Sequence, residues 1–316
     1  MPLLRFLPEA TNINFVGARY FAFALDGLLL LASIFSIAVN HFNMGIDFTG
    51  GVSTEVKYVQ QIDLDKVRSE IGGLGFKEVV IQYVGSGACD KPANSCVLIR
   101  VQPQQQTDQA NQAAAQKIKD TLGPGYTVRN TDVVGPKVSG ELFQAGVVAT
   151  LLAVFAIALW VAFRFEWQYG ISAALATGHD VLVTAGLFSV LHLDFSLTAV
   201  AALLTLAGYS INDTVVVFDR IRENRRKYKR MGLAELINLS TNQMLTRTIL
   251  TSAATATSII PLLIYGGPTL FDFSAAILFG IIVGTFSSIY VAAALLLYLP
   301  PVGGSGASEG AVEAPA

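Results

Sequence analysis

The chain has 316 residues, of which 53% are hydrophobic and only 14% are charged, and its mean hydropathy is +0.53. A soluble domain of this length needs more charge on its surface, so the composition argues against an ordinary soluble protein and favours a membrane protein. The formal net charge is -2 and no basic stripe alternates with aromatic residues, which argues against a nucleic-acid partner.

Six apolar segments are long enough to cross a bilayer, whose hydrocarbon core of about 30 Å requires roughly 20 residues of helix. The first segment is not followed by a small-residue cleavage pattern, so we expect a retained helix and not a signal peptide. The sequence therefore predicts an α-helical polytopic membrane protein. Its expected spans are residues 20–40, 143–163, 171–191, 195–218, 248–266 and 273–299.

The placement of Lys and Arg in the short loops predicts the orientation of these spans. Short basic loops remain in the cytoplasm. We therefore expect residues 1–19 and the tail 300–316 in the cytoplasm, and residues 41–142 on the outer side. The tail is of low complexity and is expected to be disordered. The loops with Lys or Arg are 164–170 and 219–247, and those without either are 192–194 and 267–272.

The outer segment 41–142 carries the pattern of a small α+β domain. Alternating residues and Gly- or Pro-containing breaks predict the order βαββαβ, which is that of a ferredoxin-like fold. The five helices that follow form the remaining membrane domain, residues 143–299. The predicted strands are 51–59, 77–84, 96–102 and 126–134, and the predicted helices are 63–72 and 108–121.

Cys89 and Cys96 flank the connection between the two middle strands of this domain. Outside the cytoplasm they can form a disulfide that closes the hairpin. Two unpaired thiols on a loop are the alternative. Two cysteines with no histidine near them in the sequence are too few for a zinc site.

Charged residues at membrane depth cost about 2.5–3.5 kcal/mol and often mark a function. Asp26 lies about two turns into the first span, near its cytoplasmic end, where reaching the interface or following a wet crevice explains it better than a function does. Asp180 lies near the middle of the third span with Thr177 and Thr184 on its helix face. Either a functional carboxylate or a protonated carboxyl bonded to a neighbouring helix fits it. His179 points about 100° away on a regular helix, so no His–Asp pair is predicted.

Asp213 and Arg247 are the stronger pair of candidates. Asp213 lies in the fourth span next to Asn212, whose amide can donate and accept hydrogen bonds. Burial favours a protonated carboxyl and a nearby cation favours the anion, so such a group can load and unload protons. A half-solvated aspartate is the alternative. Arg247 begins the fifth span, where snorkelling to the interface is the alternative to a partner for Asp213. Its helix face continues with Thr251, Thr255 and Ser258.

An ordered set of motifs resembles the SecF family of the bacterial Sec translocon accessory complex. The resemblance runs from about residue 15 to 299. The motifs are MGIDFTGG (44–51), VGPKVSGEL (134–142), FRFEW (163–167), HDVLVTAG (179–186), GYSINDTVVVFDRIREN (208–224), RTILTS (247–252) and GTFSSIYVA (284–292).

The resemblance implies half of an assembly of the resistance-nodulation-division (RND) type in the bacterial inner membrane, completed by the six-span partner SecD. It implies that the chain is not an enzyme and has no cofactor, with the proton as coupling ion. The proton-motive force then helps unfolded preproteins complete their export through SecYEG after the SecA step, with YajC and YidC as further partners. Carried over by motif, the proton pathway contains Asp213 and Arg247, with Asn212 and Asp180 as neighbours. The domain 41–142 is then periplasmic.

Three other functions are compatible with parts of the pattern. A half-size small-molecule or lipid exporter would use the same bilayer physics, but a domain of about 100 residues is small for a substrate chamber. A scaffold without proton flux is a second alternative. An intramembrane aspartyl protease could use Asp180 and Asp213, but "GYSIND" lacks the Gly-x-Gly-Asp context of such enzymes.

Overall fold

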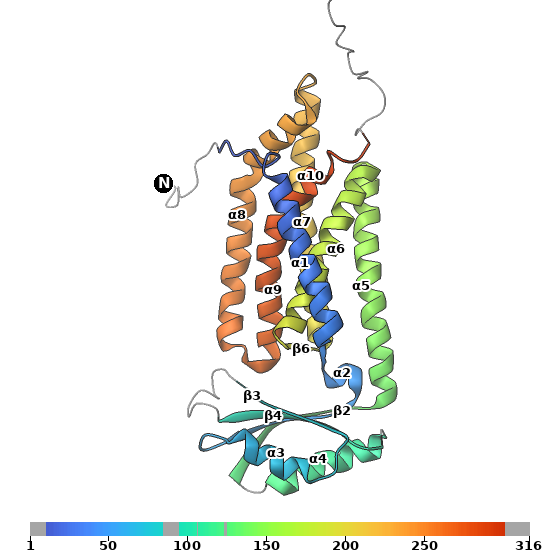
Figure 1. Cartoon of the computed structure of the whole chain (residues 1–316), viewed down its shortest axis with the longest axis vertical. Coiled ribbons are helices and arrows are strands. Elements are labelled where there is room, and N and C mark those ends of the chain that lie inside the picture. Colours follow the sequence, from blue (N-terminus) through green and yellow to red (C-terminus); the bar gives the residue numbers. More distant parts are fainter. Residues whose placement is uncertain (1–10, 85–94, 106, 123–124, 301–316) are drawn as a thin grey trace, which may run out of the picture.

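The computed structural model describes residues 11–84, 95–105, 107–122 and 125–300. Within them, six helices are long and apolar enough to span a membrane, which confirms the predicted number of spans. They run side by side along the long axis, and a small α+β domain lies at one end of the bundle (Figure 1). The spanning helices are α1 (Arg19–Asn40), α5 (Pro136–Arg164), α6 (Trp167–Val190), α7 (Leu197–Lys227), α8 (Leu233–Tyr265) and α9 (Gly267–Ser287), which continues through the π-helix η3 (Ser288–Ala292) into α10 (Ala293–Leu295).

The basic segment 219–247, expected as a loop, is largely helical. α7 continues to Lys227 and α8 already begins at Leu233. The apolar pattern marks only the membrane-embedded part, whereas Arg, Lys, Glu and Gln extend helices readily into water. Hydrogen bonds from Asn224 Nδ2 to Ser240 Oγ (2.9 Å) and Gln243 Oε1 (2.8 Å) join the two extensions.

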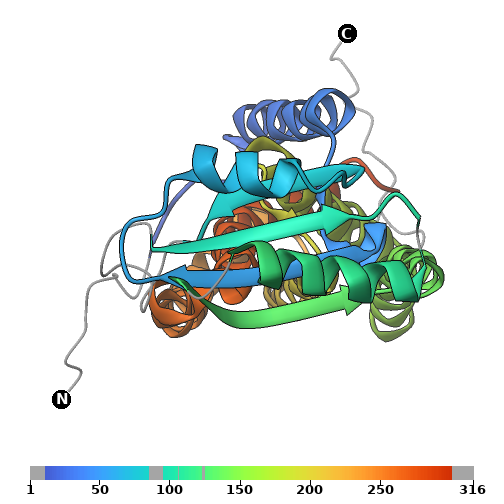
Figure 2. The same cartoon turned by 90° about the horizontal axis from the view of Figure 1, so that it is seen from below.

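The α+β domain has the predicted order of elements. Its strands form one antiparallel sheet in the order β3-β4-β2-β5, which is the split βαβ arrangement. Helices α3 and α4 cover one face of the sheet, and the other face is turned toward the bundle (Figures 1 and 2). The elements are β2 (Gly51–Tyr58), α3 (Leu64–Gly72), β3 (Glu78–Tyr83), β4 (Cys96–Gln102), α4 (Asp108–Leu122) and β5 (Tyr126–Val134).

The period-2 alternation of β2 explains the core of this domain. Val52 and Val56 point to the helical side and pack with Val67 and Ile71 of α3 and with apolar residues of α4. Cys96 begins β4 and is fully buried. Cys89 lies outside the described residues, so the Cys89–Cys96 disulfide stays a prediction.

Two glycines make the entry into β2. Gly50 and Gly51 have φ angles of +71° and +123°, in the region that favours glycine. A Cβ on Gly51 would lie 2.5 Å from the carbonyl oxygen of Val101 on the neighbouring strand. The pair therefore allows the chain to leave the short helix α2 (Ile46–Thr49) and join the sheet at once.

A second, two-stranded sheet fixes this entry to the bundle. β1 (Asn43–Met44) pairs in parallel with β6 (Asp194–Phe195), which lies between α6 and α7. Arg100 of β4 forms an ion pair with Asp194, which also accepts a hydrogen bond from Asn43 Nδ2 (3.0 Å). The Asp194 backbone N–H donates to Asp272 Oδ2 of α9 at 2.9 Å. We call Arg100, Asp194, Asp272 and Asn43 the domain latch.

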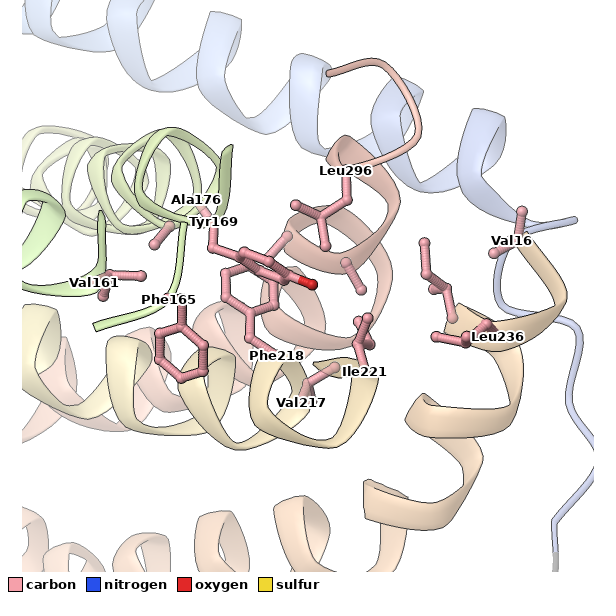
Figure 3. Close-up of a cluster of buried hydrophobic side chains, with 14 residues drawn as sticks. Val16, Val161, Phe165, Tyr169, Ala176, Val217, Phe218, Ile221, Leu236 and Leu296 are labelled. Atoms are coloured by element: carbon pink, nitrogen blue, oxygen red, sulfur yellow. The ribbon is translucent and has the colours of Figure 1, made fainter. Parts of the chain in front are cut away.

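The opposite end of the bundle has its own apolar core, drawn in Figure 3. Tyr169 of α6 packs edge-on against Phe218 of α7, with 5.0 Å between ring centroids, and both are buried. Val16, which precedes α1, and Leu236 of α8 belong to the same cluster.

The helices differ widely in how much of their surface the chain covers. In the apolar segments of α6 and α9, 61% of the residues are buried, but only 11% in α5 and 6% in α8. α5 and α8 therefore form the outside of the bundle.

Candidate functional site

Asp213 lies on α7 and is only 2% exposed. The apolar residues before it and the Arg- and Glu-rich residues after it both favour helix, so α7 passes the aspartate unbroken. Its Oδ1 accepts a long hydrogen bond of 3.4 Å from Thr251 Oγ1 of α8. Its Oδ2 is buried and has no hydrogen-bond partner in the part of the chain that the structure describes. This carboxyl group is thus removed from water and poorly satisfied.

Arg247 does not pair with Asp213 in this structure. Its side chain is exposed on α8 and lines a cavity of about 470 Å³ between α5, α7 and α8. The structure records no ion pair between the two side chains, because Asp213 faces the buried side of α7. The cavity is rich in charge: Arg164, Asp219, Arg220 and Glu223 also line it.

The hydroxyl side chains on the same face of α8 as Arg247 form hydrogen bonds with nearby groups. Thr251 contacts Asp213, whereas Thr255 Oγ1 donates to the Thr251 carbonyl (2.9 Å) and Ser258 Oγ to the Thr255 carbonyl (2.7 Å). Asn212 is exposed on α7. Neighbouring residues on a helix are about 100° apart, so Asn212 does not share the buried surroundings of Asp213.

Asp180 is fully buried on α6 and well supplied with donors. Its Oδ2 accepts from Ser210 Oγ of α7 (2.5 Å) and from Ser287 Oγ of α9 (2.9 Å). Its Oδ1 lies 3.1 Å from His179 Nδ1. Helix geometry did not imply this His–Asp contact, which forms because the imidazole reaches back to the adjacent carboxylate.

Buried hydroxyls connect the surroundings of the two aspartates. Thr214 Oγ1 of α7 lies 2.9 Å from Ser288 Oγ, and Ser288 Oγ donates to the Ser210 carbonyl at 3.4 Å. Ser210 bonds to Asp180 and lies one turn before Asp213. The π-helix η3 begins at Ser288, and such segments often occur at functional sites. The only hint in the sequence was the Ser-Ser pair within "GTFSSIYVA".

The chemistry of this region is that of proton binding within apolar surroundings. Two buried carboxyl groups lie on the neighbouring helices α6 and α7, and each has hydroxyl groups beside it that can donate and accept. Among the described residues, no group of three or more His, Cys, Asp or Glu side chains is arranged to hold a metal ion.

Comparisons with known proteins identify the family. The family described as "Protein export membrane protein SecD/SecF, C-terminal" matches residues 114–301, and the "SecD/SecF GG Motif" matches residues 35–62. The chain is 39% identical over 299 residues to the protein translocase subunit SecF of Cereibacter sphaeroides, covering 94% of this chain and 92% of that protein. The chain belongs to the SecF family. SecF of Vibrio alginolyticus is likewise 39% identical over 300 residues, with 94% and 93% covered.

Solved structures agree with this family and show its fold. A crystal structure of SecDF, a translocon-associated membrane protein from Thermus, matches with a TM-score of 0.82 and 37% identity. SecDF in a super-membrane-facing form matches with a TM-score of 0.66. The chain covers 39% of either SecDF chain, so it spans about two fifths of that protein.

The two family matches can be located on the elements of the structure. The GG motif match contains Gly50 and Gly51, whose positive φ angles lead from α2 into β2. The longer match contains all helices from α5 to α10, and thus both buried aspartates. The chain is a multi-pass membrane protein of the Sec protein-transport system.

Proposed function

We propose that the chain is the SecF subunit of a SecDF complex that uses the proton-motive force to complete preprotein export through SecYEG after the SecA step. SecD is the direct partner, and YajC, YidC and the unfolded preprotein are further partners. The complex lies in the bacterial inner membrane with both termini of this chain in the cytoplasm. The domain 41–142 is then periplasmic.

Pairing with SecD is supported by the length of the solved relatives and by the uncovered helices. The SecDF chains extend well beyond the part that matches this chain. α5 and α8 are hardly buried, and the charged cavity lined by Arg247 lies between them. A second helical half would cover these two helices.

The observation that carries the proton role is the state of Asp213. It is buried, one carboxylate oxygen lacks any partner in the described structure, and the other has only a 3.4 Å hydrogen bond. Such a carboxyl is favoured in its neutral form and becomes an anion when a cation approaches. Arg247, or a residue of SecD, is that cation in one state of the cycle. Asn212 and Asp180 act as neighbours of this path.

The energy of one proton is sufficient to bias such a two-state element. A charge that crosses the membrane carries about 2.3 kcal/mol per 100 mV, equivalent to roughly a fiftyfold bias in an equilibrium. Allosteric couplings are typically about 1–3 kcal/mol. Protonation of Asp213 therefore releases its cationic partner, the helices repack, and the change reaches the outer domain through the domain latch.

The test is Asp213→Asn in the chain assembled with SecD. We expect the membrane-potential-dependent part of preprotein export into inverted vesicles to be lost, while the complex still assembles. Asp120→Asn on the exposed side of α4 makes the same chemical change away from the membrane and should export normally. Export by Asp213→Asn that still responds to the potential would favour a scaffold without proton flux.

A further inference from the structure

A second group of ionisable residues lies between α1 and α6. Asp26 of α1 is 4% exposed, and neither of its carboxylate oxygens has a hydrogen-bond partner among the residues that the structure describes. His179 of α6 lies between two oxygens: Nε2 is 3.4 Å from the Asp26 backbone carbonyl and Nδ1 is 3.1 Å from Asp180 Oδ1. Asp26 is thus covered by protein in this structure.

The surroundings of the His179 ring favour the imidazolium form. A neutral imidazole has one N–H donor and one lone pair, and an imidazolium has two donors. Both ring nitrogens of His179 face oxygen atoms that can only accept, if Asp180 is ionised. With an ionised Asp180, two donors match two acceptors, and the imidazolium is the form of His179 that satisfies both contacts.

The same count assigns the charges of the two aspartates. Asp180 receives hydrogen bonds from two serine hydroxyls and from His179, which stabilises its anion. The positive charge of the His179 imidazolium and the negative charge of Asp180 cancel. A charged Asp26 would leave one buried negative charge uncompensated, so Asp26 is the neutral, protonated member.

We propose that Asp26, His179 and Asp180 form a second proton-binding site, separate from Asp213. The site holds two exchangeable protons in its neutral state, one on Asp26 and one on His179. When one leaves, the cluster becomes negative. His179 contacts the Asp26 backbone carbonyl on one side and the Asp180 carboxylate on the other, so its ring lies between the two residues.

Among the described residues, the neighbouring helices add hydroxyls to this site and no further charge. The charged groups that act on Asp26 and His179 are the other two members of the cluster. α7 contributes Ser210 and α9 contributes Ser287. Ser210 is also the residue one turn from Asp213, so the proposed site adjoins the proposed proton path. Its role in export rests on the proposed function, but its proton binding does not.

The chain has only three histidines, His41, His179 and His192, which makes a direct test practical. The protonation of each ring is measured by nitrogen NMR of histidine-labelled chain, in its complex with SecD in lipid vesicles, between about pH 5 and 9. His179→Gln identifies the His179 signals. We expect His179 to be an imidazolium at neutral pH, and the imidazolium-to-neutral ratio to fall about tenfold or more in Asp180→Asn, because a charge-assisted hydrogen bond is lost.

Asp26→Asn supplies the second arm of the test. It should leave His179 as an imidazolium at neutral pH and remove one of the two titration steps of the cluster. Thr184→Val is the matched control, since Thr184 is buried on the same helix and its hydroxyl has no partner in the described structure. Its histidine titration should equal that of the parent chain.

Two results would overturn the proposal. One is a neutral His179 ring in the unmodified chain at neutral pH. The other is a His179 titration that does not respond to Asp180→Asn or Asp26→Asn while the signals of His41 and His192 show an intact fold. The readout does not depend on export, so failure here leaves the Asp213 proposal standing, and normal export by Asp213→Asn leaves this one standing.

Discussion

Two buried aspartates of the same bundle have very different surroundings. Asp180 accepts three hydrogen bonds, the shortest of 2.5 Å, whereas Asp213 accepts one of 3.4 Å. Hydrogen bonds to a carboxylate stabilise its charged form. The carboxylate of Asp180 is therefore much better supplied with hydrogen-bond partners than that of Asp213.

Ser210→Ala tests the support of Asp180. The variant removes its closest donor and should lower the free energy of unfolding by about 1–2 kcal/mol, since the acceptor is charged but lies among membrane helices. Unfolding in mixed micelles of increasing denaturing detergent measures the change. Thr205→Val on the same helix is the control, because the Thr205 side chain is exposed and its hydroxyl donates to the Ala201 carbonyl of the same helix (2.7 Å). Equal losses in both variants would show that the Ser210 bond contributes nothing of its own.

The sequence identified individual ionisable residues better than their partners. Asp180 and Asp213 stood out because a carboxylate in an apolar run is costly. The contacts with His179, Ser210 and Ser287 did not, since they depend on the rotation of α6, α7 and α9 about their axes. Hydropathy does not specify such rotations to within one residue.

At the scale of elements, α1 and α6 approach each other closely at Gly186. A Cβ on Gly186 would lie 2.3 Å from Ser33 of α1, and a hydrogen bond of 2.9 Å joins Ser36 and Ser189 one turn further on. Small residues allow this kind of contact between membrane helices. The contact also holds Asp26 against His179.

Gly186→Ala should therefore push α1 away from α6. Overpacking of this kind costs about 1–3 kcal/mol, and we expect a lower unfolding midpoint in detergent together with a changed His179 signal. Gly178→Ala on the same helix is the control, because no atom lies within 4 Å of its added Cβ. Alanine is the better helix former, so this control should be neutral or slightly stabilising. A Gly186→Ala chain as stable as the control would contradict the close packing.

Secondary structure was predictable where periodicity and composition agree. The elements of the α+β domain begin and end within one or two residues of expectation, because alternation in strands and glycine or proline breaks coincide. The predicted end of α7 and the predicted start of α8 each differ from the structure by nine or more residues. Hydropathy marks only the apolar part of a helix and gives no signal where the helix continues into water. The β1–β6 pair was not foreseen, because two-residue strands carry no periodic pattern.

At the scale of the whole molecule, the domain latch joins the α+β domain to the bundle. Burial raises the pKa of Asp194, and the Arg100 charge partly opposes that rise. The Arg100 side chain is 7% exposed and that of Asp194 is 22% exposed, so neither charge is well solvated. Removing one member of such a pair leaves the other charge buried and uncompensated, which costs about 3 kcal/mol.

Arg100→Gln should loosen the domain latch at neutral pH. It should also raise the pKa of Asp194 further, because the Arg100 cation that opposes the rise is gone. A carboxyl whose native pKa lies above its unfolded value contributes stability below the unfolded pKa and loses it as the pH rises through the native value. The defect of the variant should accordingly shrink as the pH falls and Asp194 takes up a proton. Amide hydrogen exchange at the paired strands Asn43–Met44 and Asp194–Phe195, measured as a function of pH, reports the opening of the domain latch.

Arg68→Gln provides the matched comparison, because Arg68 pairs with Asp65 on the exposed surface of α3, where an ion pair contributes little. Exchange at the β1–β6 strands should be unchanged in that variant at every pH. Exchange that is unaffected in Arg100→Gln, or a defect that grows as the pH falls, would mean that the backbone pairing and Asp272 hold the domain without the Arg100–Asp194 pair. With the expected outcome, the Arg100–Asp194 ion pair, which lies outside the spanning helices, contributes to holding the α+β domain against the bundle.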